Sequence, residues 1–349
     1  MDFYGYMRPN GKAGARNYVL LLPVNRSLNF IASNVERMTR NTRHFEIPAE
    51  TGRTEVDREV IARTLIGLMN NANVGGIVLL AVKSGAGSAY KNMCAERFEE
   101  EARKTGKPFR IVYLTNVGGS YNMLGETLRL TREVLLEVSD FRRENCPLSA
   151  LTLGVKCGTS DATSGIAGNP CVGAAFDQLI RAGGTAFFSE TTEIIGAEDL
   201  VAKRAVNESV AKKILSAAKH WEDKAKATGE DIRKINPIPA NIAAGISSLE
   251  EKSLGAIAKS GTSPIQDVLK YAEMPKGSGL YFVDSWMSSL SLPLCLTACG
   301  ATIMLYQMGG GKIAQHPMMP SINPTVVSPF LYLTGNAIAY SRAPDNFDF

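Results

Sequence analysis

The chain has 349 residues, of which 45% are hydrophobic and 21% charged, and its formal net charge at pH 7 is +4. This length exceeds what one ordinary hydrophobic core holds, so two domains are expected. The slight charge, without a basic run interleaved with aromatic residues, argues against nucleic acid as a partner, and no apolar run is long enough to span a bilayer.

The cysteines and histidines of the sequence exclude further classes of protein. The six cysteines are scattered without a Cys-x-x-Cys pair, which argues against a disulfide framework and a zinc ribbon. Three histidines make a site with several histidine ligands nearly impossible. The first residues lack the basic and apolar segments of a secretory leader. We therefore expect a cytoplasmic protein.

The first half of the chain alternates short apolar runs with amphipathic segments. Buried strands are expected at 18–24, 74–82 and 109–114, and helices at 28–38, 54–69, 88–105 and 123–141. This alternation predicts an α/β fold with a parallel sheet. A polar stretch at 142–147 marks the boundary between an N-terminal domain, 1–146, and a C-terminal domain, 147–349.

The second half repeats the rhythm with more polar loops. Strands are expected at 148–155, 184–189, 280–283 and 301–306, with helical segments at 172–181 and 197–226. The segment 236–245 is too rich in proline and glycine for regular structure. A second parallel α/β sheet is therefore expected.

The loop after 148–155 concentrates small polar side chains among glycines. It carries Cys157, Ser160, Asp161, Ser164 and Asn169. Asn169 followed by Pro170 is typical of a helix start, with Asn169 as the N-cap. At the carboxyl end of a parallel strand such a loop faces the crevice where ligands bind. The alternative, a loop that is polar only because it is exposed, explains this density less well.

Three further loops follow predicted strands. Glu190 and Glu193 follow 184–189, Asp284 follows 280–283, and a glycine run with a lysine follows 301–306. Backbone N–H groups of such a run can wrap an anion, although it is not a Walker motif. If all four loops meet at one sheet edge, the cleft suits an acidic polyol and a hard or borderline divalent metal.

Lys252 is a candidate base in the stretch that opens a short helix. It follows Glu250 and Glu251, and neighbouring carboxylates can tune the pKa of a lysine. Ser247 and Ser248 before the two glutamates also resemble a capping box, so a purely structural role for Glu250 and Glu251 stays open.

These observations give a set of candidate site residues. We predict Lys252, Glu193 and Asp161 as catalytic groups, and Cys157, Asp161, Glu190 and Glu193 as metal ligands. For Cys157 a buried thiol without such a role is the alternative. Substrate contacts are predicted for Ser160, Ser164, Asn169, Glu190, Asn241, Gly309, Gly310, Gly311 and Lys312. Amide replacement of Asp161 or Glu193 is expected to abolish turnover and leave the fold intact.

The stretches 5–19, 157–170, 183–198 and 236–255 resemble those of the altronate/galactarate dehydratase family, which includes the large subunit of sulfolactate sulfo-lyase. The resemblance implies elimination of water or sulfite from a 2-hydroxy acid, with a divalent metal that is usually Fe²⁺ and otherwise Mn²⁺, Mg²⁺ or Ca²⁺. It implies a homodimer formed through the first domain and a Rossmann-like second domain with an unusual crossover. A small β-clip (SAF-type) subunit is a possible partner in trans.

The first half departs from the dehydratase pattern. Ser27, Ala49 with Gly52 and Arg53, and Ser84 stand where the dehydratases carry three cysteines and a histidine. The sulfo-lyase branch also lacks those cysteines and has an arginine at the position of Arg53. These departures weaken an altronate or galactarate assignment.

Two departures lie in the second half. The family's Thr-Gly-Arg-Gly loop reads Met-Gly-Gly-Gly at 308–311, and this removes an arginine that could pair with a carboxylate. The chain stops at Phe349, where relatives continue. We therefore expect a shortened form or a truncated piece.

Three functions are weighed on this basis. The leading hypothesis is a hydro-lyase that removes the proton α to a carboxylate. The alternatives are a carbon–sulfur lyase acting on a sulfolactate-like substrate and a non-catalytic paralogue that binds a sugar acid. A nicotinamide-dependent oxidoreductase is disfavoured, because no expected strand is followed by G-x-G-x-x-G.

Overall fold

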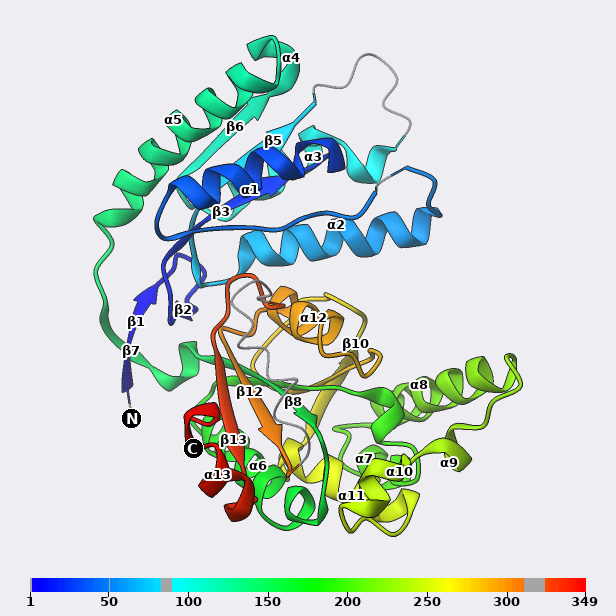
Figure 1. Ribbon diagram of the computed structural model, residues 1–349. Helices are drawn as coiled ribbons and strands as arrows, with labels where there is room; N and C mark the ends of the chain where they lie inside the picture. The colour runs from blue at the N-terminus through cyan, green and yellow to red at the C-terminus, as the bar shows by residue number, and fades with distance from the viewer. Residues whose placement is uncertain (1, 50, 83–89, 311–323) are drawn as a thin grey trace.

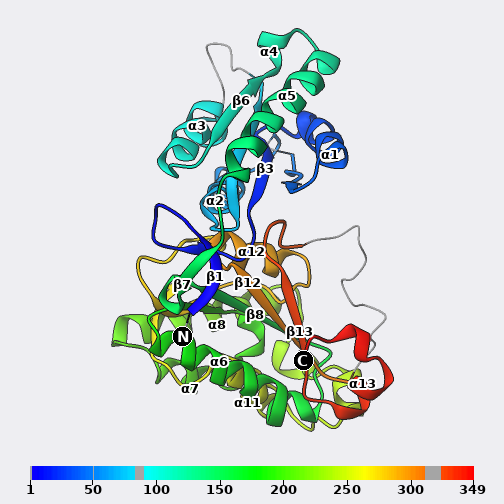
Figure 2. The same cartoon turned by 90° about the vertical axis from the view of Figure 1, so that its left-hand side faces the viewer.

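The structure is a computed structural model that describes residues 2–49, 51–82, 90–310 and 324–349. Two α/β domains are stacked one above the other in Figure 1, and the view turned by 90° in Figure 2 shows the same two layers. The predicted α/β fold with two parallel sheets is confirmed. Within the described part of the chain, no helix has both the length and the apolar character needed to cross a membrane.

The N-terminal sheet has the order β4-β3-β5-β6, and all its strands are parallel. The strands are β3 (Tyr18–Pro23), β4 (Thr42–His44), β5 (Val74–Ala81) and β6 (Phe109–Tyr113). Every residue of the central strand β5 is buried, as expected for a parallel strand that is covered on both faces. The three predicted strands of this half are confirmed, and β4 was not predicted.

Helices cover both faces of this sheet. On one face lie α1 (Asn29–Met38) and α5 (Ser120–Ser139), preceded by the short α4 (Leu114–Val117). On the other face lie α2 (Glu55–Asn70) and α3 (Ala95–Lys104). Thr54 caps α2 by accepting a hydrogen bond from the N–H of Asp57. The helix predicted over 88–105 begins only at Ala95 among the described residues.

A small antiparallel sheet lies where the domains meet. It has the order β2-β1-β7, formed by β1 (Asp2–Met7), β2 (Ala13–Gly14) and β7 (Glu144–Pro147). Both views show β1 and β7 side by side. The chain start is thus tied to the connection between the domains. The division at residues 146 and 147 falls inside β7 and stays a prediction.

The C-terminal sheet has the order β10-β11-β9-β8-β12-β13, again with every pairing parallel. Its strands are β8 (Thr152–Gly158), β9 (Thr185–Phe188), β10 (Ile265–Leu269), β11 (Gly279–Val283), β12 (Ile303–Met308) and β13 (Phe330–Thr334). Numbered one to six along the chain, they follow the order 3-4-2-1-5-6 instead of the Rossmann order 3-2-1-4-5-6. The predicted Rossmann-like variant is confirmed, and its unusual feature is that β11 inserts between β10 and β9.

The helices of this domain differ in part from the prediction. They are α6 (Asn169–Arg181), α7 (Glu198–Ala202), α8 (Glu208–Lys226), α9 (Ile232–Ile235), α10 (Pro239–Ala243), α11 (Leu249–Ile257), α12 (Ser291–Cys299) and α13 (Ala337–Arg342). The single helical region expected over 197–226 is divided, because Asn207 caps α8 by accepting from the N–H of Val210. The segment 236–245 is wrongly predicted as irregular throughout, since it contains α10.

The two domains pack through α2 and α12. The side-chain amide of Asn71 donates to the carbonyls of Thr297 and Ala301, both at 2.9 Å. Gly67 of α2 approaches α12 so closely that a Cβ there would lie 2.2 Å from the carbonyl oxygen of Ala298. This contact has no room for a side chain, which explains a glycine inside a helix.

We expect Gly67→Ala to destabilise the protein by about 1–3 kcal/mol, because the added methyl group overpacks the contact between α2 and α12. Gly125→Ala in α5 is the matched control, since a Cβ at this exposed position meets no atom within 4 Å. Alanine there should stabilise α5 by about 0.5–1 kcal/mol. Thermal unfolding of both variants checks this, and equal shifts would contradict the close approach.

Candidate active site

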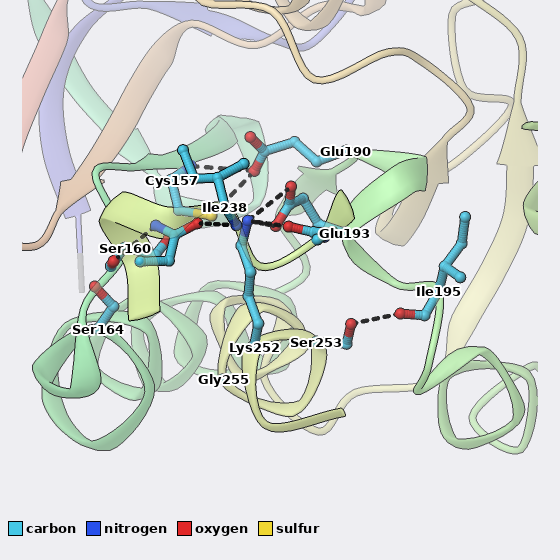
Figure 3. Close-up of polar contacts among 12 residues, drawn as sticks. Cys157, Ser160, Ser164, Glu190, Glu193, Ile195, Ile238, Lys252, Ser253 and Gly255 are labelled. Atoms are coloured by element: carbon cyan, nitrogen blue, oxygen red, sulfur yellow. Dashed lines mark hydrogen bonds and ion pairs between the residues drawn. The ribbon is translucent and has the colours of Figure 1, made fainter. Parts of the chain in front are cut away.

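Loops from several strands meet at the carboxyl edge of the C-terminal sheet. The loops after β8 and β9 lie beside α11, and Figure 3 shows side chains from these three parts of the chain pointing toward one another. Gly309 and Gly310 follow β12 and join the same edge, because the N–H of Gly310 donates to Asp161 at 2.6 Å. The loops after β8, β9 and β12, which were predicted to converge, therefore meet here.

The contacts of Asp284 differ from those of the other predicted site residues. Its Oδ1 accepts from Thr191 Oγ1 at 2.8 Å and from the indole N–H of Trp221 at 2.9 Å. It lines an open groove beside α8 instead of the cavity described next. The loop after β11 thus reaches the same sheet edge through Thr191, which lies between Glu190 and Glu193, but Asp284 does not line the cavity.

A cavity of about 240 Å³ lies between the loop after β8 and the start of α11. Its lining includes five residues predicted for the site: Ser160, Asp161, Ser164, Asn169 and Lys252. The other lining residues are Ala162, Gly165, Ile166, Ile246, Glu251, Leu254, Gly255 and Ala256. The lining thus combines two serines, one asparagine and one lysine with the carboxylates of Asp161 and Glu251 and with apolar side chains, around a space that is large enough for a small organic acid.

Lys252 lies on the wall of this cavity in a buried ion pair. Its Nζ is 3.3 Å from Glu193 Oε2 and donates to Asn236 Oδ1 at 2.5 Å. The side chain of Lys252 is 7% exposed and that of Glu193 is 4% exposed. Figure 3 shows the ammonium group of Lys252 directed toward Glu193. A carboxylate oxygen and an amide oxygen thus hold the nitrogen of Lys252 at a fixed position.

The start of α11 explains this placement. Ser248 caps the helix by accepting from the N–H of Glu251, while Glu251 accepts from the N–H of Ser247 at 2.7 Å. Glu251 therefore has the capping role that the sequence left open for the two glutamates. Lys252, the next residue of the helix, reaches Glu193. Sequence reasoning missed Asn236, the second partner of Lys252.

Asp161 organises the loop after β8. Its Oδ1 accepts from Thr163 Oγ1 at 2.6 Å and from the N–H of Ser164 at 2.9 Å, and its Oδ2 accepts from Asn336 Nδ2 at 2.8 Å. Burial alone would raise the pKa of Asp161, but these hydrogen bonds and that from Gly310 outweigh burial and lower it. Asp161 therefore stays an anion that ties three segments together.

The glycine run after β12 binds this internal anion. The N–H of Gly310 is taken by Asp161, and that of Gly309 donates to Gly158 O at 3.2 Å. A Cβ at Gly309 would lie 2.4 Å from the carbonyl oxygen of Thr159, so only glycine allows this approach. The predicted contacts of Gly309 and Gly310 with substrate stay predictions. Gly311 and Lys312 lie outside the described residues.

Two asparagines support the same loop. Asn241 Nδ2 donates to Ser160 O at 3.0 Å and Asn169 Nδ2 donates to Gly255 O at 2.8 Å. The N-cap role predicted for Asn169 is wrong, because a π-helical turn at Ser164–Gly168 runs directly into α6. The Oδ1 of Asn169 is buried and has no hydrogen-bond partner within the described ranges. Asn169 lines the cavity, but this oxygen is itself buried.

A second charged cluster is buried beneath the cavity. Glu190 Oε2 accepts from Lys259 Nζ at 2.5 Å, and Glu190 Oε1 accepts from Lys156 Nζ at 3.2 Å. Cys157 Sγ lies 3.1 Å from Lys259 Nζ and 3.2 Å from Glu190 Oε2. Each of these four residues is at most 4% exposed. Glu190 has a φ of 72°, an unfavourable backbone conformation that the surrounding contacts maintain.

Burial and charge set the ionisation states in this cluster. Burial tends to raise the pKa of Glu190, but the charges of Lys259 and Lys156 outweigh it and lower the pKa to about 2. Burial and the charge of Glu190 raise the pKa of Cys157 to about 12. Cys157 is therefore a neutral thiol, which agrees with the alternative of a buried thiol.

Lys156 and Lys259 were missed at the level of sequence. The available signal for Lys156 was a lysine inside an otherwise apolar strand, between Val155 and Cys157. Charged residues are almost never fully buried unless they are paired, so this position pointed to a buried carboxylate. Lys259 carried no comparable local signal at the end of a helical segment.

The predicted metal ligands do not assemble around one point. Among the described residues, no three histidine, cysteine, aspartate or glutamate side chains are arranged to hold a metal ion. Lysines already pair with Glu190 and Glu193, and five donors surround Asp161. These residues therefore do not fit a divalent metal, and the chemistry below is derived without one.

Of the positions that differ from the dehydratase pattern, those of the first half are placed as follows. Ser27 is part of a 3-10 turn, Arg26–Leu28, that precedes α1. Arg53 is exposed before α2 and donates to Ala49 O at 2.5 Å. Ser84 lies outside the described residues.

Comparison with known proteins gives consistent matches along the chain. The family profile described as "D-galactarate dehydratase/Altronate hydrolase, second domain" matches residues 5–139, and "D-galactarate/Altronate dehydratase, C-terminal" matches residues 148–349. The chain is 33% identical to (2R)-sulfolactate sulfo-lyase subunit beta of Chromohalobacter salexigens, over 92% of this chain and 80% of that protein.

Two dehydratases are also similar. The chain is 32% identical to altronate dehydratase of Bacillus subtilis and 31% identical to galactarate dehydratase (L-threo-forming) of Escherichia coli. In each case the match covers 88% of this chain but 62% of the relative. The chain thus spans less than two thirds of the length of these two dehydratases.

Proposed function

Because this chain belongs to the D-galactarate/altronate dehydratase family, we propose that it is a lyase that eliminates water from a sugar acid or a related 2-hydroxy acid. The observation that supports this most directly is that Lys252, which lines the cavity, is held in a buried ion pair with Glu193. A proton-transfer group there faces hydroxyl and amide side chains that suit a polyol carboxylate.

The proposed step is an elimination across C2 and C3 of the acid. The ammonium group of Lys252 first passes a proton to Glu193, its partner at 3.3 Å. The resulting amine takes the proton from C2, and the C–H electrons form the C2=C3 double bond as the C3–O bond breaks. Lys252 returns the proton to the leaving hydroxyl, which departs as water, and the enol rearranges to the 2-keto acid. Glu193 and Asn236 hold Nζ in place and stabilise the ammonium group that forms.

The opposite wall of the cavity supplies substrate contacts. Ser160 and Ser164 offer hydroxyl groups, and Asn169 adds an amide side chain to the lining. Asp161 holds the loop that carries the two serines, so its role here is to position the loop. These assignments keep the predicted residues but separate the ones that contact substrate from the ones that organise the wall.

A carbon–sulfur lyase is the second candidate. It is supported by the similarity to a protein named (2R)-sulfolactate sulfo-lyase subunit beta, of which this chain covers 80%. The proton is taken from C2 in the same way, but the C3–S bond breaks and sulfite leaves. Only the identity of the leaving group separates the two candidates.

Product analysis tests both proposals. Purified protein is incubated anaerobically with a panel of sugar acids and sulfolactate, without metal and with Fe²⁺, Mn²⁺ or Mg²⁺, while 2-keto acid and sulfite are measured together. Keto acid without sulfite supports the dehydratase, and keto acid with sulfite supports the carbon–sulfur lyase. A need for metal would support the predicted divalent cofactor, for which the described residues provide no ligand set.

A partner subunit is tested in the same assay. The protein is assayed alone and with a small β-clip subunit, and its molecular mass is measured by light scattering to test the predicted homodimer. No product under any of these conditions would contradict the lyase proposal and favour a sugar-acid-binding protein.

A further inference from the structure

We propose that the ammonium group of Lys259 is a built-in cation that occupies the position between Cys157 and Glu190 and closes it to divalent metals. This inference goes beyond the proposed function, because it assigns a role to a residue outside the cavity and holds whichever acid is the substrate. It rests on the geometry of four buried side chains: Lys156, Cys157, Glu190 and Lys259.

The separation of the two potential ligands is suited to a bridging cation. Cys157 Sγ and Glu190 Oε2 are 3.2 Å apart. Metal–sulfur and metal–oxygen distances of about 2.0–2.3 Å would let one ion contact both atoms. Instead, Lys259 Nζ contacts both, at 3.1 Å from the sulfur and 2.5 Å from the oxygen. The ammonium nitrogen and a metal ion would compete for the same space.

Both carboxylate oxygens of Glu190 already accept hydrogen bonds from groups of this chain. Its Oε2 accepts from the N–H of Cys157 at 3.2 Å in addition to Lys259, and its Oε1 accepts from Lys156. Glu190 thus receives protein donors on both oxygens. A divalent ion could bind only by displacing at least one of them.

The charges of the four buried side chains also oppose binding of a divalent metal. Two ammonium groups face one carboxylate, so this buried group already carries a net charge of +1. An added divalent ion would stand beside two like charges in a region without solvent, where repulsion is poorly screened. Removing the charge of Lys259 and shortening its side chain should therefore open the site.

Cobalt binding tests this directly. Co²⁺ bound by a cysteine thiolate gives a sulfur-to-metal charge-transfer absorption, which does not depend on enzyme activity. We expect no such absorption that depends on Cys157 in the wild-type protein loaded with Co²⁺. In Lys259→Ala the absorption should appear, because a thiolate, a carboxylate and space for water become available. It should be lost again in the double variant Cys157→Ser with Lys259→Ala.

Two matched variants sharpen the result. Lys259→Met fills the space without a charge and is expected to give no absorption. Lys226→Ala, which changes an exposed lysine at the end of α8, should likewise give no absorption, as in the wild type. An absorption in the wild type that Cys157→Ser removes would overturn the proposal, even if Lys259→Ala failed to fold. Folded Lys259→Ala without the absorption would also overturn it. Turnover, or its absence, enters neither outcome, so this test is separate from that of the lyase function.

Discussion

Lys252→Met is expected to lower kcat of the proposed elimination by about 10²–10⁴-fold, because it removes the group that takes the C2 proton. Methionine keeps most of the length and volume of lysine but has no basic nitrogen. The measurement is the steady-state rate of 2-keto acid formation on the substrate found in the panel. Thermal unfolding of the variant checks that the loss is not due to misfolding, since Glu193 loses its buried partner.

Lys252→Arg separates proton transfer from carboxylate binding. Arginine keeps the positive charge but is not deprotonated in proteins, so a proton-transfer role predicts that kcat falls as in Lys252→Met. If Lys252 only bound the substrate carboxylate, Lys252→Arg would keep kcat and raise KM. Lys226→Met, at an exposed lysine at the end of α8, is the matched control and should have wild-type kinetics.

Glu190→Gln is expected to have the largest effect on stability, about 3–5 kcal/mol. The change leaves the ammonium groups of Lys156 and Lys259 buried without an opposing charge. Breaking a buried ion pair on one side costs far more than the net contribution of the intact pair. The unfolding free energy measured with denaturant checks this value.

Glu208→Gln is the control for this prediction. Glu208 pairs with Lys212 on the surface, and its side chain is 82% exposed. Surface pairs contribute about 0–1 kcal/mol, so this variant should change stability little. Similar losses in the two variants would contradict the view that Glu190 balances a buried pair of lysines.

The strand and helix rhythm could be predicted because most strands of both parallel sheets are covered by helices. Such strands have continuous apolar runs in the sequence, as β3 and β5 do. The edge strand β10, with Gln266 and Asp267 inside it, lacks that signal. The pairing of β1 with β7 joins segments about 140 residues apart, which no local pattern reveals.

The sequence could predict only those parts of the site that depend on the residues within a single loop. The polar loop after β8 and Lys252 indeed line one cavity. Which carboxylate meets which lysine depends on the tertiary fold, so the pairing of Lys252 with Glu193 and of Lys259 with Glu190 could not be derived. For the same reason, carboxylates that read as metal ligands in the sequence are partners of lysines in the structure.

The central claim is that Lys252 starts the elimination by taking the proton from C2. Following the fate of that proton tests this claim most directly. The substrate found in the panel is prepared with deuterium at C2, and its conversion is followed by NMR in ordinary water. We predict that the deuterium is lost to solvent as the 2-keto acid forms, and that the wild-type protein does this while Lys252→Arg does not. Keto acid that retains the deuterium, or equal deuterium loss in Lys252→Arg, would contradict the account.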